Sequence, residues 1–117
     1  MRTLEIGTRK YTEVKVLDEP GQGNANHKYE VVLVENRNQV VCEVNFQNGP
    51  IKEFGVNGVA NEDLIAIVID RLRGFQSGDY TCASNDKAIA CLHFALEELR
   101  SRTNEREARG VEGTNEK

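Results

Sequence analysis

The chain has 117 residues, of which 38% are hydrophobic and 29% are charged, and its formal net charge is -4 at pH 7. This length and apolar content suffice for one domain with a modest core, which self-association would help to stabilise. The acidic balance argues against a protein that coats duplex DNA or an anionic membrane, because those partners require a broad basic surface. Any nucleotide ligand should therefore be small and bound locally.

Targeting signals and paired cysteines are both missing from the sequence. No apolar run approaches the roughly 18 residues of a membrane span, and the N-terminus lacks the pattern of a signal peptide, which predicts a cytosolic protein. Cys42, Cys82 and Cys91 are odd in number and form no close pair. We therefore expect reduced, buried thiols and no disulfide framework.

Residues 1–46 have the pattern of an antiparallel β-sheet. Val, Ile, Tyr and Thr recur between turn residues in four predicted strands, which cover residues 3–7, 11–17, 28–35 and 39–46. Residues 35–38 predict a hairpin turn, and residues 18–26 predict a mobile loop. Residues 47–60 form a turn-rich connection in which two turns bracket a short, strand-like segment. Two helices follow in residues 61–109, which gives an α+β fold with a loop or tail at residues 110–117.

The first helix should begin with Asn61 as its N-cap and end near Phe75. Its apolar residues surround most of its circumference, so we expect central burial; they are Leu64, Ile65, Ile67, Val68, Ile69 and Leu72. Glu62 and Asp63 occupy the first turn and would repel a phosphate there. A P-loop interpretation of the preceding glycines therefore fails.

The second helix, residues 84–109, carries an apolar seam with alternating steps of three and four residues, formed by Ile89, Leu92, Leu96 and Leu99. This seam can pack on the first helix or on the same helix of another copy, so the helix is a candidate for oligomerisation. Extending the seam brings Thr103, Arg106 and Gly110 into line.

Arg102, Arg106 and Arg109 share one face at the end of this helix. A guanidinium offers a planar fork of donors that matches phosphate, and it stays charged at physiological pH. Arginines near a helix C-terminus also favour the dipole and pair with nearby glutamates, so a solvated helix end is the alternative. Because the arginine face continues the packing seam, these arginines should lie near a packed surface. The pattern therefore favours an anion-binding site over a solvated helix end.

Residues for catalysis or metal binding are sparse. Cys91 and His93 are two positions apart on a helix, so their side chains diverge and cannot share a metal or act as a nucleophile pair. Asp70 lies beside Arg71 and Arg73, which favour surface ion pairs. We therefore predict no catalytic residues, no metal site and no cofactor.

Phe75 and Tyr80 bracket the segment after the first helix. They are candidate groups for stacking on a base, and a place in the core is the alternative.

Four sequence blocks together resemble the first-described phage Thoeris anti-defence family. In chain order they are residues 46–53 (Phe-Gln-Asn-Gly-Pro-Ile-Lys-Glu), 55–58 (Gly-Val-Asn-Gly), 61–72 (Asn-Glu-Asp-Leu-Ile-Ala-Ile-Val-Ile-Asp-Arg-Leu) and the Arg-Thr to Gly-Val-Glu-Gly-Thr run that ends at Thr114. The resemblance covers about residues 46–114, and the N-terminal strands match only loosely. The tail also resembles the phage anti-CBASS cyclic-oligonucleotide sponge, and we expect the block that begins at Phe46 to separate the two families.

The resemblance implies a single sponge domain, residues 1–117, that sequesters immune signalling cyclic nucleotides in the cytoplasm of the bacterial host. Members of the family bind glycocyclic ADP-ribose (gcADPR) in pockets shared between the protomers of a dimer. By motif, base stacking falls to Phe75, a polar contact to Asn85, and the phosphate clamp to Arg102 and Arg106. Relatives often carry an acidic residue where this chain has Ser84, so its ribose-side contacts should differ.

The resemblance also implies hexamers built from three dimers, with cyclic di- or trinucleotides bound where the tails of several chains converge. In this chain that second site would comprise Arg109, Gly110, Val111, Glu112, Gly113 and Thr114. A frayed terminus is the alternative for such a tail. Two other function classes stay open: an enzyme that degrades the signal, and a protein–protein inhibitor that uses the apolar seam as a helix-in-groove surface.

Overall fold

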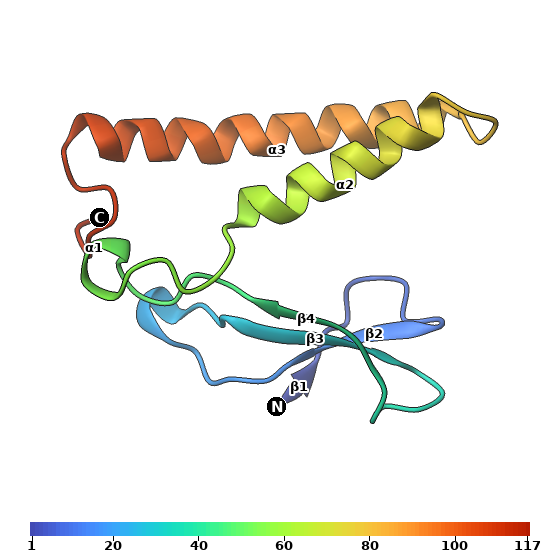
Figure 1. The fold of residues 1–117 in the computed structure, drawn as a ribbon, viewed down its shortest axis with the longest axis horizontal. Coiled ribbons are helices and arrows are strands. Elements are labelled where there is room, and N and C mark those ends of the chain that lie inside the picture. The colour runs from blue at the N-terminus through green and yellow to red at the C-terminus, as the bar shows by residue number, and fades with distance from the viewer. The chain divides into compact units, whose positions relative to one another are not determined.

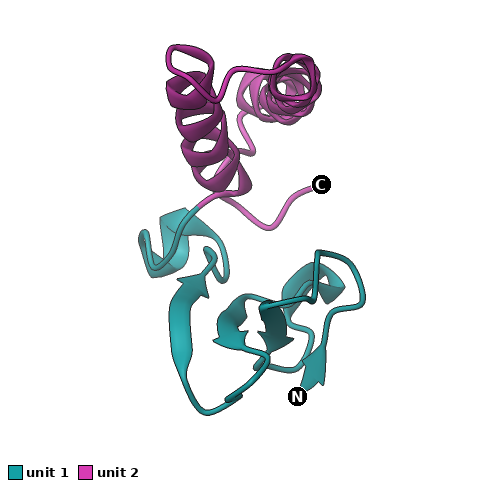
Figure 2. Cartoon of the chain, turned by 90° about the vertical axis from the view of Figure 1, so that its right-hand side faces the viewer, with its two compact units in different colours: residues 1–59 teal, residues 60–117 magenta.

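A computed structural model describes residues 1–117 of the chain. The chain divides into two compact units, residues 1–59 and residues 60–117 (Figure 2). The first unit contains a four-stranded antiparallel sheet, and the second contains two long helices. The predicted α+β class is confirmed, and the boundary between the units falls at the end of the predicted turn-rich connection.

The sheet in the first unit is an antiparallel meander whose strand order follows the sequence (Figure 1). Its strands are β1 (Arg2–Thr3), β2 (Thr12–Val16), β3 (Lys28–Leu33) and β4 (Val40–Asn45). The last three predicted strands are confirmed to within two residues at each end. The first is wrong in extent, because β1 ends at Thr3 and the chain bends at residues 5–7.

The core of this unit lies on β2 and β3, where Val16 and Val32 are fully buried. Glu13 on β2 is also buried, and its carboxylate pairs with the guanidinium of Arg37. Arg37 belongs to the turn between β3 and β4, which a hydrogen bond from the Gln39 amide to the Asn36 carbonyl closes at 2.9 Å. This confirms the predicted hairpin turn and gives the buried charge the partner that it requires.

The loop between β2 and β3 contains a short 3-10 turn, η1 (Gln22–Asn24), and is closed by Asp18. The Asp18 carboxylate accepts hydrogen bonds from the backbone amides of His27 at 3.0 Å and Lys28 at 3.2 Å. Desolvation raises the pKa of Asp18, but these two bonds and that from the Asn26 side chain lower it by more, so the pKa lies below its ordinary value.

The predicted strand-like segment after β4 is wrong, because it forms a short helix, α1 (Ile51–Phe54). The side chain of Asn57 donates through Nδ2 to the Asn48 backbone carbonyl and accepts through Oδ1 from the Asn48 backbone N–H, both at 2.8 Å. The side chain of Gln47 likewise donates to the Gly55 carbonyl and accepts from the Asn57 amide, both at 2.9 Å. The side chains of Gln47 and Asn57 thus bond to backbone groups that a strand would pair with a neighbouring strand. These bonds close residues 47–57 into a loop that contains α1.

The second unit is a helical hairpin of α2 (Asn61–Gln76) and α3 (Ala83–Ala108). Both predicted helices are confirmed to within one residue at each end. The predicted N-cap of α2 is wrong by one residue: the cap is Ala60, whose amide donates to the Asp63 carboxylate at 2.8 Å. None of the helices is both long and apolar enough to cross a membrane.

Central burial of α2 is also wrong. Ile69 is buried, but Ile67 and Val68 are 63% and 45% exposed. The reason is that α3 is the one helix of this unit that packs against α2, so it covers a single stripe. The apolar residues on the rest of the circumference remain open.

The seam of α3 packs on α2, as one of the two predicted uses of the seam requires. The seam and its extension as far as Arg106 are partly or fully buried, as is Asn85; these residues are Ile89, Leu92, Leu96, Leu99, Thr103 and Arg106. Gly110, which was also expected in line with the seam, lies beyond the end of α3 and is exposed. The seam therefore has a packing partner within the chain, which argues against its use as a helix-in-groove surface.

The three cysteines are free, as expected, but the expectation that they are buried is wrong. Cys42 lies on the edge strand β4, Cys82 is the N-cap of α3, and Cys91 lies on the side of α3 that faces away from α2. All three positions lie outside the two small cores.

Candidate functional site

The residues expected to contact a ligand lie in two clusters, one at each end of α3. Phe75 and Asn85 flank the turn between α2 and α3, a region that we call the hairpin tip (residues 75–85). Arg102 and Arg106 lie in the last turns of α3, which we call the α3 base (residues 102–109). At a rise of about 1.5 Å per residue, Asn85 and Arg102 are about 25 Å apart. One nucleotide cannot contact both clusters of the same chain.

Gln76, the last residue of α2, closes the hairpin tip. Its side-chain amide donates to the Cys82 carbonyl and accepts from the Cys82 amide, both at 2.9 Å. It also accepts a hydrogen bond from the side chain of Asn85 at 3.1 Å. Asn85 reaches the Tyr80 carbonyl as well, at 3.5 Å. Sequence reasoning missed Gln76, since nothing local marks a glutamine whose partner is a backbone six residues away.

Phe75 is half-buried and lies in a small aromatic cluster. Its ring meets that of Tyr80 edge to face, with centroids 6.3 Å apart at 88°. The guanidinium of Arg71 lies over the Phe75 ring, with its central carbon 5.1 Å from the centroid. Phe75 is therefore neither a fully buried core residue nor a fully exposed stacking group, because its ring is partly packed and partly open. Arg71 was missed as a member of this cluster.

The surface ion pairs expected between Asp70 and its two arginine neighbours are wrong. Arg71 lies over Phe75, and Arg73 contacts His93 on α3 with 2.6 Å between a guanidinium nitrogen and Nε2. Because a guanidinium can only donate, Nε2 of His93 is the acceptor in this contact. No three His, Cys, Asp or Glu side chains lie close enough together to hold a metal ion.

The three arginines of the α3 base have three different surroundings. Arg102 is exposed and makes no hydrogen bond or ion pair within the chain. Arg109 pairs with Glu105, four residues earlier, and also donates to the Lys117 carbonyl; the Arg109 and Glu105 side chains are about half exposed. This pair matches the solvated helix end that the sequence also allowed, and such pairs contribute little.

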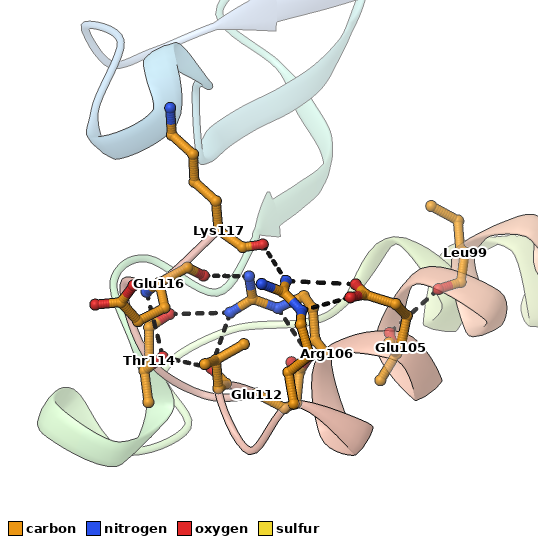
Figure 3. A network of polar contacts seen from close by, with 10 residues as sticks. Leu99, Glu105, Arg106, Glu112, Thr114, Glu116 and Lys117 are labelled. Carbon is orange, nitrogen blue, oxygen red and sulfur yellow. Dashed lines mark hydrogen bonds and ion pairs between the residues drawn. The ribbon is translucent and has the colours of Figure 1, made fainter.

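Arg106 is enclosed by the residues that follow α3 (Figure 3). Its side chain is 11% exposed, and Nε donates to the Glu112 carboxylate at 3.1 Å. The same guanidinium donates to the carbonyls of Val111 at 3.0 Å and Thr114 at 3.2 Å, and to that of Glu116. An arginine has five N–H donors, so four of them are used.

The tail after α3 is ordered by this guanidinium and by its own turns. Gly110 has φ 73, which lets the Val111 amide donate to the Arg106 carbonyl and the Gly110 amide to that of Glu107, both at 3.0 Å. These two bonds form a Schellman motif, which satisfies the last carbonyls of the helix. Residues 111–114 are half-buried, so this part of the tail is built into the unit and the frayed alternative does not describe it.

Comparison with known proteins gives two matches. A family model described as the Acb2/Tad1 hairpin domain matches residues 38–103. A protein of Bacillus phage SBSphiJ7 described as Thoeris anti-defense 1 is 50% identical over 97 residues, and the aligned part covers 83% of this chain and 66% of that protein. The range matched by the family model includes the hairpin tip and Arg102, whereas Arg106 and the tail lie beyond it.

Proposed function

The chain belongs to the Acb2/Tad1 hairpin-domain family, and on this basis we propose that it is a phage anti-defence protein that sequesters immune signalling cyclic nucleotides without degrading them. It would act in the cytoplasm of the infected bacterium by keeping the signal from its effector. The first ligand we expect is gcADPR. The observation that carries this proposal is the chemistry of the two clusters on the hairpin, which matches the parts of a nucleotide.

Each part of the ligand would meet a suitable group. A base would stack on Phe75, beside the cation of Arg71, and a polar group would bond to Asn85. The unpaired guanidinium of Arg102 would bind a phosphate. A stacked base contributes about 1 to 3 kcal/mol and a charge-assisted bond about 1.5 to 3 kcal/mol. Nanomolar affinity, about 12 kcal/mol, therefore requires several such contacts in a preorganised pocket.

A complete pocket would need two copies of the chain. Because the hairpin tip and the α3 base are about 25 Å apart in one chain, a pocket would combine the tip of one copy with the base of another. A two-fold dimer with antiparallel hairpins would then contain two equivalent pockets. Ile67, Val68 and Phe94, which are 63%, 45% and 69% exposed, supply apolar surface for such pairing.

Arg106 has a different role from Arg102 in this proposal. Its guanidinium already donates to the Glu112 carboxylate and to carbonyls of the tail. A phosphate would therefore have to compete with the Glu112 carboxylate for this guanidinium. Arg102 would then make the primary phosphate contact. The tail residues Arg109 to Thr114 would form the second site, for cyclic di- or trinucleotides, in a hexamer of three dimers.

The test combines binding with recovery of the ligand. We expect gcADPR to raise the melting temperature, native mass spectrometry to find two ligands per dimer, and heat-denatured protein to release the ligand unchanged. Release of a cleaved product would identify an enzyme instead. A melting temperature that gcADPR does not change would contradict the proposal.

A further inference from the structure

We infer that Gln76 is a positioning residue that fixes the side-chain amide of Asn85, so that the Asn85 oxygen is left to accept a hydrogen bond from the ligand. The inference rests on the proposed function, because it concerns the same site. Asn85 would therefore recognise a hydrogen-bond donor of the ligand, such as a ribose hydroxyl or the exocyclic amine of a base. It would not bind a phosphate oxygen.

The orientation of the Gln76 amide is set by the backbone of Cys82. A backbone N–H can only donate and a backbone carbonyl can only accept. The Gln76 atom 2.9 Å from the Cys82 amide must therefore be Oε1, and the atom 2.9 Å from the Cys82 carbonyl must be Nε2. The usual ambiguity between the two ends of a glutamine amide is thus removed.

The orientation of Asn85 follows from that of Gln76. One end of the Asn85 amide lies 3.1 Å from Gln76 Oε1 and 3.5 Å from the Tyr80 carbonyl oxygen. Both of these atoms are acceptors, so the atom between them must be Nδ2. The Asn85 oxygen, Oδ1, accepts no hydrogen bond from the chain and remains available.

The free oxygen limits what Asn85 can recognise. Phosphate oxygens in a nucleotide diester carry no proton at neutral pH, and two acceptors in contact would leave both unsatisfied. A nucleotide that stacks on Phe75 offers two kinds of donor near its base, the ribose hydroxyls and an exocyclic amine. Either fits the Asn85 oxygen, and ligand analogues can distinguish them.

The experiment measures the affinities of gcADPR and its analogues by calorimetry. One analogue carries hypoxanthine, in which a carbonyl replaces the exocyclic amine, and others each lack one ribose hydroxyl. The unaltered protein should bind gcADPR about tenfold more tightly than the analogue without the recognised donor, which is the effect of one lost hydrogen bond in a buried site. The analogue that shows this loss identifies the donor.

Substitution of Gln76 then tests the positioning role. In Gln76→Met the Asn85 amide can turn, so the tenfold preference should fall to about twofold or less. Gln76→Glu keeps an acceptor for Asn85 and for the Cys82 amide but loses the donor to the Cys82 carbonyl, so it should be less stable and, where it is folded, should retain the preference. Gln47→Met is the matched control, because Gln47 makes the same kinds of contacts in the first unit and lies outside the site.

Four results would overturn the inference. One is a Gln76→Met variant that weakens all ligands by the same factor and keeps the preference, and another is an unaltered protein that prefers gcADPR over none of the analogues. The third applies if circular dichroism shows that Gln76→Met does not fold: it is loss of the preference in a Gln76→Glu variant that circular dichroism shows to be folded. Absence of any gcADPR binding to the unaltered protein would remove the proposed function itself, and this inference with it.

Discussion

The guanidinium of Arg106 and the carboxylate of Glu112 form an ion pair that joins α3 to the tail, with 3.1 Å between Nε and Oε2. Glu112 is 38% exposed, so it can leave the pair without first unfolding the helix. In the proposed site this carboxylate would compete with a phosphate for the Arg106 guanidinium.

The first prediction concerns Glu112→Gln. Removing the charge weakens the competitor for the Arg106 guanidinium, so the affinity for gcADPR should rise by about two- to fivefold if Arg106 contacts the phosphate, since a partly exposed pair contributes about 0.5 to 1 kcal/mol. Calorimetry measures the change. Glu107→Gln is the control, because it removes an exposed carboxylate of α3 whose side chain makes no bond to Arg106. Lower affinity in Glu112→Gln would show that the tail supports the pocket instead of competing with the ligand.

The second prediction separates Arg102 from Arg106. Arg102→Ala removes a side chain without partners, so the unliganded melting temperature should stay unchanged while gcADPR binding weakens about 10- to 100-fold. Arg106→Ala should weaken binding and also lower the melting temperature, because Val111, Glu112 and Thr114 lose their common donor.

Arg100→Ala provides the control for both arginine variants. Arg100 is exposed on α3 and should affect neither the melting temperature nor the affinity. Equal destabilisation by Arg102→Ala and Arg106→Ala would contradict the difference in their surroundings.

The third prediction tests the stacking role of Phe75. Phe75→Leu keeps an apolar side chain beside Tyr80 but removes the flat ring, so the variant should fold and bind gcADPR more weakly by about 1 to 3 kcal/mol. Thermal unfolding and calorimetry on the same sample separate the two effects. A variant that unfolds would show that the ring serves mainly as core, and one that binds normally would show that no base stacks there.

The sequence predicts the long helices well because their signal is local. The seam of α3 repeats at helical spacing and continues through Thr103 to Arg106, but not to Gly110, where the helix has ended. Patterns of this kind need no knowledge of the partner. The prediction that α2 is centrally buried is wrong for the opposite reason. Apolar residues around a whole helix predict burial without indicating which surface would cover each side, and within this chain only α3 packs on α2.

The short helix α1 and the role of Gln76 could not be predicted for a different reason. In both places a glutamine or asparagine side chain pairs with the backbone of a residue six to ten positions away. Such a bond depends on how the intervening chain closes, so no local propensity or periodicity reports it. The same holds for Arg106, whose spacing with Arg102 predicted a shared helix face but not its enclosure by the tail.

The fourth prediction concerns pH and Asp18. Because the pKa of Asp18 lies below its ordinary value of 3.8 in the folded chain, its carboxylate contributes stability that is fully present above that value and is lost as the pH falls through the lower, folded pKa. Asp18→Asn should therefore be less stable than the unaltered protein at neutral pH, and the difference should shrink in acid. Thermal unfolding across this range measures the trend. Glu19→Gln is the control, since that exposed neighbour makes no hydrogen bond.

The last prediction concerns two glycines in different surroundings. At Gly58 an added Cβ would lie 2.6 Å from the carbonyl oxygen of Asn45 and even closer to the backbone of Phe46, which pairs with Val59 in a parallel bridge. Backbone atoms held in this bridge cannot move aside, so Gly58→Ala should destabilise the chain by about 1 to 3 kcal/mol. At Gly74, inside α2, an added Cβ would meet nothing within 4 Å. Gly74→Ala should instead stabilise the chain by about 0.5 to 1 kcal/mol through helix propensity.

Urea unfolding of the two variants measures these changes of opposite sign. Gly58 lies in one of the sequence blocks that resemble the Thoeris anti-defence family, so its substitution also tests whether that block requires a glycine for packing. If Gly58→Ala is as stable as the unaltered protein, the close backbone approach between residues 45–46 and 58–59 is wrong, and the glycine must have another role. If both variants lose stability equally, the difference in space between the two sites does not decide the outcome.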